Sequence, residues 1–90
     1  MLDAVKDYLK ITWSDEDGEL ARLIAQGEAD LTELAGADPD FETEGLARSL
    51  LFDYCRYAYN NASEYFEENF AAKILRLQIQ TGVKELPDEA

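Results

Sequence analysis

Carboxylates dominate the side chains of this sequence that could do chemistry. Of its 90 residues, 20 are Asp or Glu and none is His, which excludes histidine metal sites and catalysis by Ser–His or Cys–His pairs. The acidic run Asp15–Gly18 is reminiscent of a calcium loop. An EF-hand needs three alternating ligands before its Gly and a Glu six residues after it, but position 24 is Ile. We therefore interpret the run as the capped start of a helix.

Two other groups of carboxylates could act as a general acid and base. Glu64, Glu67 and Glu68 lie near the start of an expected helix, and Asp38 and Asp40 flank a proline in an expected loop. Acid–base catalysis needs burial or a neighbouring like charge to tune the pKa of a carboxyl group. Both groups are expected to face water, so we predict no acid–base site in either place.

Cys55 is the single cysteine, so no disulfide can form within the chain. Without a histidine to activate it, we interpret this thiol as part of the core or of an interface. A lone cysteine and an acidic stretch over residues 1–7, where a signal peptide would be basic, favour an intracellular protein. The glycines form no phosphate-binding loop. We predict no catalytic, cofactor or metal site, and no enzyme.

The charge balance argues against a surface that grips nucleic acid. The net charge is −12, whereas phosphates must be neutralised by Lys and Arg. Residues 56–61 interleave tyrosines with a single Arg, which falls short of the basic and aromatic pattern that stacks nucleobases. No apolar run approaches the roughly 20 residues that cross a bilayer, so we expect no membrane partner either.

The apolar residues predict an all-α fold. Leu occurs 12 times, against 6 for Ile and Val together, which favours helices over strands. Spacing of apolar residues, Ser14 as an N-cap, and Gly36 and Gly82 as terminators predict a small bundle of about four helices. Their approximate ranges are 2–10, 15–35, 44–61 and 63–81. We expect one domain over residues 1–82 and a mobile acidic tail over residues 83–90.

The helix expected over residues 44–61 is predicted to be the centre of the bundle. Leu50, Leu51, Tyr54 and Ala58 share its apolar face, and Asp53 belongs to its narrow polar strip. Gly27, inside the apolar stripe of the preceding helix, predicts a close approach of another helix backbone.

The last two helices have more apolar surface than a protein of this size can cover. We therefore predict that residues on their second faces contact other subunits: Phe52, Tyr59, Leu75 and Ile79. The loop before the central helix is stiffened by Pro39 and has an aromatic, Phe41, that we expect to be exposed. Pro39 and Phe41 are the candidates for docking a partner protein.

Two segments of the chain resemble a known family. Residues 5–11 (VKDYLKI), the acidic turn 14–17 and the following Leu20, Leu23, Ile24, Gly27 and Leu31 resemble the start of the head–tail connector proteins of tailed phages, also called head-completion or adaptor proteins. Residues 50–62 (LLFDYCRYAYNNA) are similar to the second signature of that family, a leucine-rich helix that ends in an aromatic-Tyr-Asn segment. The similarity covers roughly residues 2–80.

The resemblance implies a structural subunit of the virion, made in the cytoplasm of a bacterial host and placed at the head–tail junction. About a dozen copies would form a homo-oligomeric ring. That ring would join the portal protein to a tail-completion protein and extend the DNA channel, through which DNA passes without specific binding. No catalysis and no cofactor are implied.

Two other interpretations stay open. The first is an acidic protein-interaction module, such as a regulator that mimics the charge of DNA. Residues 1–45 hold 13 acidic and 3 basic side chains, which is the charge asymmetry that such a module needs. The second is an enzyme of an unrecognised kind, which the missing histidine and the lack of a deep cleft disfavour.

Overall fold

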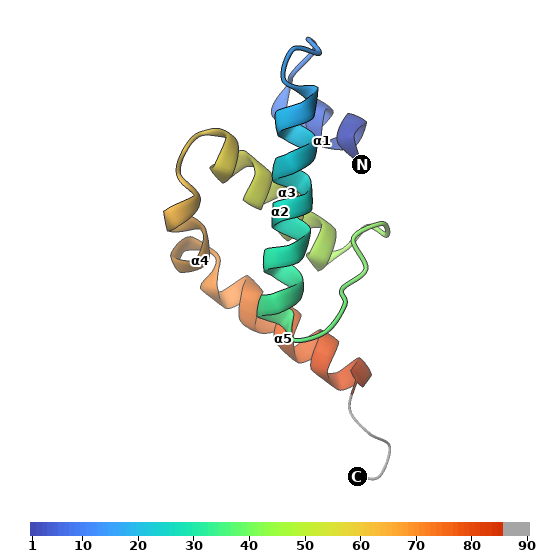
Figure 1. Ribbon diagram of the computed structural model, residues 1–90. Coiled ribbons are helices and arrows are strands. Elements are labelled where there is room, and N and C mark those ends of the chain that lie inside the picture. The colour runs from blue at the N-terminus through green and yellow to red at the C-terminus, as the bar shows by residue number, and fades with distance from the viewer. Residues whose placement is uncertain (86–90) are drawn as a thin grey trace.

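The computed structural model describes the backbone of residues 1–85 and the side chains of residues 1–81. This part of the chain is all-α and has no β-strand, as expected (Figure 1). In chain order its elements are α1 (Leu2–Leu9), α2 (Asp17–Ala35), α3 (Leu46–Tyr59), the 3-10 turn η1 (Ser63–Tyr65), α4 (Phe66–Asn69) and α5 (Ala71–Glu85). Among the described helices, none combines the length and the apolarity needed to span a bilayer.

The first three helices match the prediction in order, with ends displaced by one or two residues. Lys10 has a left-handed backbone with φ of 62° and ends α1. Gly36 ends α2 at φ of 78°, a conformation that its missing Cβ makes easy. Helix α3 ends at Tyr59, two residues before the predicted end, and Asn61 has a left-handed backbone with φ of 58°.

The predicted N-cap, Ser14, does not cap α2 with its side chain. The helix begins at Asp17, and its N-cap residue Glu16 makes no capping hydrogen bond through its side chain. Glu16 Oε1 instead accepts hydrogen bonds from Trp13 Nε1 at 2.9 Å and from Tyr59 Oη at 2.8 Å. The acidic turn therefore ties the start of α2 to α3, and this tertiary contact replaces the local cap.

The fourth predicted helix, residues 63–81, is divided into η1, α4 and α5. Phe70, with φ of −115° and ψ of 22°, separates α4 from α5. Phe70 and Ile74 still donate their N–H groups to the carbonyls four residues earlier, at 2.9 Å each. The apolar spacing of Phe66, Phe70 and Ile74 is thus that of a continuous helix, which is why the sequence does not reveal the break.

The predicted end of the last helix is also wrong. Helix α5 runs through Gly82 to Glu85, four residues beyond the predicted end at residue 81. A glycine inside a helix costs about 1 kcal/mol relative to Ala, which is too little to end a helix by itself. The rest of the predicted tail, residues 86–90, lies outside the described residues.

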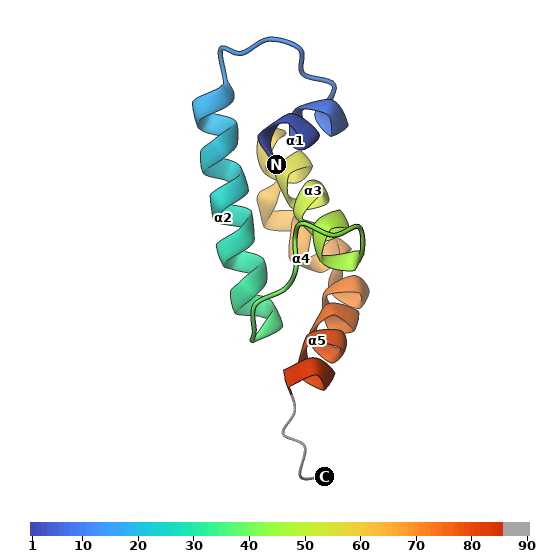
Figure 2. The same cartoon turned by 90° about the vertical axis from the view of Figure 1, so that its right-hand side faces the viewer.

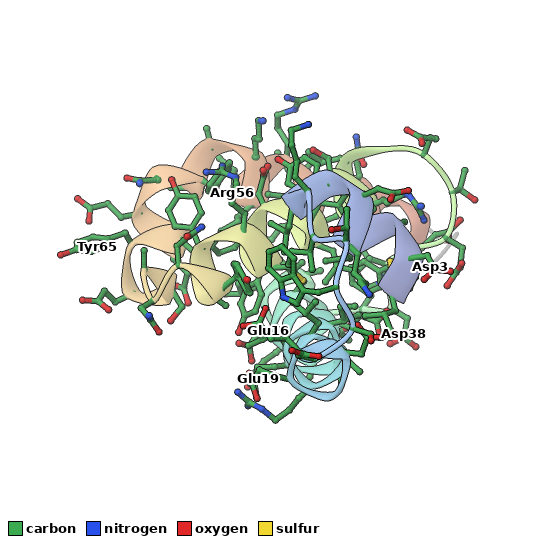
Figure 3. All side chains as sticks on the ribbon, turned by 90° about the horizontal axis from the view of Figure 1, so that it is seen from above. Asp3, Glu16, Glu19, Asp38, Arg56 and Tyr65 are labelled. Atoms are coloured by element: carbon green, nitrogen blue, oxygen red, sulfur yellow. The ribbon has the colours of Figure 1, made fainter. Side chains whose placement is uncertain are left out.

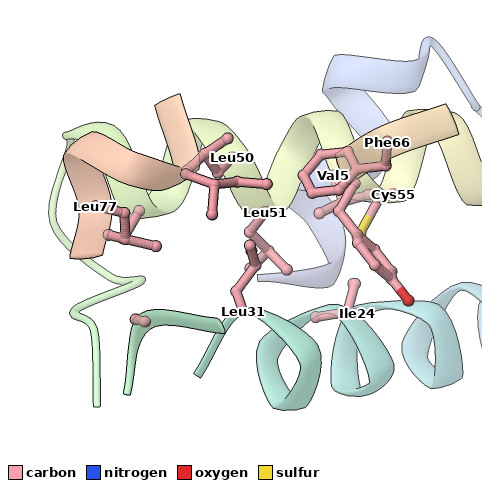
Figure 4. Close-up of a cluster of buried hydrophobic side chains, with 12 residues drawn as sticks. Val5, Ile24, Leu31, Leu50, Leu51, Cys55, Phe66 and Leu77 are labelled. Atoms are coloured by element: carbon pink, nitrogen blue, oxygen red, sulfur yellow. The ribbon is translucent and has the colours of Figure 1, made fainter. Parts of the chain in front are cut away.

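Helix α3 is the centre of the bundle, as predicted. Helices α1, α2, α4 and α5 all contact it. Figure 2 shows α2 along one side of the molecule, with α3 and α5 on the other side. Leu50 and Leu51 are fully buried and Tyr54 is buried, whereas Ala58 is half-buried. The core that α3 shares with its neighbours is drawn in Figure 4 and includes Val5, Ile24, Leu31, Leu50, Leu51, Cys55, Phe66 and Leu77.

Gly27 marks a close contact between α2 and side chains of α3. A Cβ added there would lie 2.8 Å from Tyr54 Cδ1 and 2.9 Å from Leu51 Cδ1. The neighbours are therefore side chains of α3 and not its backbone, which corrects the predicted form of the contact. Because both side chains are buried, neither can move away to admit a methyl group.

Leu51→Ala should reduce the free energy of unfolding by about 2–5 kcal/mol, because it leaves a cavity at a fully buried position. Denaturant unfolding followed by circular dichroism measures this loss. A loss below about 0.5 kcal/mol would mean that this face of α3 is not part of the core.

Gly27→Ala should destabilise the protein by about 1–2 kcal/mol, because overpacking against Leu51 and Tyr54 outweighs the gain in helix propensity. The matched control is Gly18→Ala in the same helix, where a Cβ meets nothing within 4 Å. The control should be neutral or stabilising by up to about 1 kcal/mol. Equal effects of the two substitutions in denaturant unfolding would disprove the close contact.

Candidate interaction surfaces

The carboxylates singled out in the sequence are dispersed, and some of them make contacts that hold the fold together. Lys6 Nζ pairs with Asp17 Oδ1 at 2.7 Å and links α1 to α2. Asp40 Oδ1 accepts the N–H groups of Glu42 at 2.9 Å and Thr43 at 3.3 Å in the loop between α2 and α3. The acidic side chains of η1 and α4 are exposed: Glu64, Glu67 and Glu68. Within residues 1–81, no three Cys, Asp or Glu side chains are grouped in a way that could hold a metal ion.

Cys55 lies in the core, at 0% exposure. Burial, followed by the nearby charge of Glu28, raises the pKa of its thiol to about 12. The thiol therefore stays protonated at neutral pH, whereas a nucleophilic cysteine must be a thiolate. This environment fits the core role that the sequence suggested.

Asp53 is a buried polar residue that the sequence analysis placed on the polar strip of the helix. It is only 7% exposed, and its Oδ1 accepts a hydrogen bond from Tyr8 Oη at 2.7 Å. Arg56 Nη2 lies 3.4 Å from the same oxygen. The hydrogen bond to Asp53 raises the pKa of Tyr8, followed by a smaller effect of burial. Tyr8 comes from α1, so helix periodicity within α3 could not show that this carboxylate would be covered.

Two further tyrosine hydroxyls donate to carboxylates in other helices. Tyr54 Oη donates to Asp30 Oδ2 at 2.7 Å, and Tyr59 Oη donates to Glu16 at 2.8 Å. Burial, and then the bond to Asp30, raises the pKa of Tyr54 well above its ordinary value. The bond to Glu16 raises the pKa of Tyr59. All three hydroxyl–carboxylate contacts connect α3 to α1 or to the start and middle of α2.

The four predicted interface residues fall into two pairs with different surroundings. Phe52 and Tyr59 are half-buried and have partners within the chain. The ring of Phe52 lies 5.3 Å from that of Tyr8, and the guanidinium of Arg48 lies 5.0 Å from its centroid. Tyr59 is held by its bond to Glu16. These two side chains therefore stabilise the monomer, whatever else they contact.

Leu75 and Ile79 lie in open solvent, with exposed fractions of 55% and 56%. The buried residues in the described part of α5 form one narrow stripe: Ile74, Leu77 and Thr81. The opposite side of the helix, which we name the outer face of α5, consists of Ala72, Leu75, Arg76 and Ile79, all exposed. These residues have the i, i+3, i+4, i+7 spacing of an amphipathic stripe. The helix thus has a second apolar face that the described residues leave uncovered.

The proposed docking loop is less open than the sequence suggested. Phe41 is half-buried and packs against the core, so its expected exposure is wrong. Arg48 Nη1 donates a hydrogen bond to its carbonyl oxygen at 3.2 Å. Pro39 is also half-buried and lines a shallow hollow of about 180 Å³ beside Leu77 and Thr81. This volume is below the roughly 300–1,000 Å³ that is typical of ligand pockets.

Charge is divided between the two sides of the molecule. Helix α2 holds five acidic residues and one Arg, whereas residues 71–81 of α5 hold Lys73 and Arg76 and no acidic residue. Seen from above, Glu16 and Glu19 lie on the α2 side and Arg56 on the opposite side (Figure 3). Helix α2 is therefore acidic, whereas residues 71–81 of α5 are apolar and basic.

No protein-family model, curated protein or solved structure matches this chain. The interpretation of its surfaces therefore rests on its own residues and on the resemblance of its two sequence segments.

Ile79→Glu should leave the monomer folded, because this side chain contacts solvent, whereas Phe52→Glu should destabilise it by about 2–4 kcal/mol through loss of the Tyr8 and Arg48 contacts. Thermal unfolding followed by circular dichroism compares the two variants. Unfolding caused by Ile79→Glu would show that the outer face of α5 is needed within the monomer.

Proposed function

We propose that this protein is a non-catalytic assembly subunit of the head–tail connector class of tailed phages. The observation that supports assembly most directly is the outer face of α5, where Leu75 and Ile79 are more than half exposed and lie outside the core that the described residues form. A contiguous exposed apolar face is typical of a protein–protein contact. The connector class is suggested by the resemblance over residues 5–31 and 50–62.

Several residues of that resemblance lie in the core of the fold. Val5 and Leu20 are fully buried, Gly27 forms the close contact, and Leu50 and Leu51 fill the centre. The resemblance thus concerns residues that set how the helices pack. The surfaces that would meet a portal and a tail-completion protein are free to differ, as surface residues usually do.

The charge is compatible with a conduit for DNA. With 20 acidic and 8 basic residues, the chain offers little to neutralise phosphates. A ring of such subunits would let DNA pass without holding it. Its productive partners are then other proteins: further copies of itself, the portal, and a tail-completion protein.

A second candidate function is an acidic module that mimics DNA, and the acidity of α2 favours it. Five carboxylates along one helix could compete with DNA for a basic partner. The exposed apolar face of α5 has no role in a DNA mimic, so we place the DNA-mimic function second.

The connector function predicts that the protein forms rings on the portal protein of the phage that encodes it, and that it does not bind duplex DNA at ordinary ionic strength. Negative-stain electron microscopy of the mixture detects rings, and a fluorescence titration with a labelled duplex detects binding. The portal alone and the duplex alone are the controls.

Duplex binding that weakens with salt, together with no association with the portal, would contradict the connector function. Displacement of DNA from a basic protein, again without portal association, would favour the DNA-mimic alternative.

A further inference from the structure

We propose that the outer face of α5 in one copy packs against the outer face of α2 in a second copy, and that this contact repeats head to tail. The inference rests on the proposed function, which requires copies to join, and it names the two surfaces that meet. The outer face of α5 is apolar and uncovered, so it needs a partner surface. We infer that this partner is the outer face of α2 in a second copy.

The outer face of α2 has a shape that suits a second helix. It consists of exposed residues on the side away from the core: Arg22, Ala25, Gln26, Ala29 and Glu33. Ala25 and Ala29 are one turn apart and project little from the helix, so a second helix can approach closely there. Helices pack when the ridges of one fill the grooves of the other, at about 8–10 Å between axes. Leu75 and Ile79, also one turn apart, supply the ridge.

The charges on the two faces are complementary. Arg76 lies within the outer face of α5, and Glu33 lies at the edge of the outer face of α2. Neither has a hydrogen bond or an ion pair within the described residues, whereas Arg22 is already paired with Glu19. Lys73 adds a second cation on α5, where residues 71–81 contain no acid. Packing Leu75 and Ile79 on the alanines would bring unpaired charges of opposite sign together.

A single copy cannot make this contact with itself. Helices α2 and α5 lie on opposite sides of the molecule, with α3 on the α5 side (Figures 2 and 3). Both bury their inner faces in the shared core, so their outer faces point away from each other. The contact must therefore join different surfaces of two copies, which generates a ring if the rotation closes.

Site-directed cross-linking tests the contact in the full chain. Ala25→Cys and Ile79→Cys proteins are mixed at high concentration and treated with a short bis-maleimide, while Cys55 stays unreactive because it is buried and protonated. We expect a covalent dimer in the mixture, none from either protein alone, and a ladder of multimers from the double variant. A mixture of Glu68→Cys with Ile79→Cys is the matched control and should give no dimer.

A charge exchange tests the proposed ion pair between Arg76 and Glu33. Arg76→Glu and Glu33→Arg should each lower the yield of the cross-linked dimer roughly fivefold, and the two changes together should restore it. Glu68→Arg, in α4, should have no effect. Failure of the double exchange to restore the yield would overturn the pairing of Arg76 with Glu33.

The results separate this inference from the proposed function. Cross-linking of Ile79→Cys with itself, or no product in any mixture, would overturn the α5–α2 contact. Rings on the portal that persist with Ile79→Glu would also overturn it, while leaving the connector function standing. Cross-links at the expected positions without portal association would support the contact and contradict the connector function.

Discussion

The close approach of α2 to α3 at Gly27 fixes the positions of the other helices. With no side chain at this position, Leu51 and Tyr54 pack directly against the α2 backbone. The hydroxyl of Tyr54 then reaches Asp30 one turn further along α2, which sets how the two helices are placed along each other. Helices α1 and α5 each pack against both α3 and α2. A bulkier residue at Gly27 would disturb each of these contacts at once.

The helical class, the order of the first three helices and most of the core followed from the sequence, because they depend on local periodicity. Leu50 and Leu51 were recognised as core from their spacing alone. The break at Phe70 escaped notice because apolar spacing and backbone hydrogen bonds continue across it. Burial of Asp53 depends on Tyr8, 45 residues away in sequence, and no local pattern encodes that contact.

The candidate interaction surface also depends partly on local periodicity and partly on contacts between segments that are distant in the sequence. Leu75 and Ile79 could be assigned to a second face of their helix by periodicity, and the structure shows that face exposed. Periodicity assigned Phe52 and Tyr59 in the same way, yet both have partners within the chain. The difference arises because α1 and the acidic turn before α2 cover one side of α3, whereas no described segment covers the outer side of α5. Whether the second apolar face of a helix stays exposed therefore depends on whether segments distant in the sequence pack against it.

The tyrosine hydroxyls that join the helices also set a limit on the conditions that the fold can withstand. Tyr8, Tyr54 and Tyr59 each donate a hydrogen bond to a carboxylate, and the pKa of each phenol is raised above its ordinary value. A phenol with a raised pKa contributes stability that is complete below its unfolded-state pKa, near 10, and is lost as the pH rises through its folded-state pKa. Above that point each contact would place a phenolate against a carboxylate. Raising the pH through these pKa values therefore removes three contacts that join α3 to α1, to α2 and to the turn before α2.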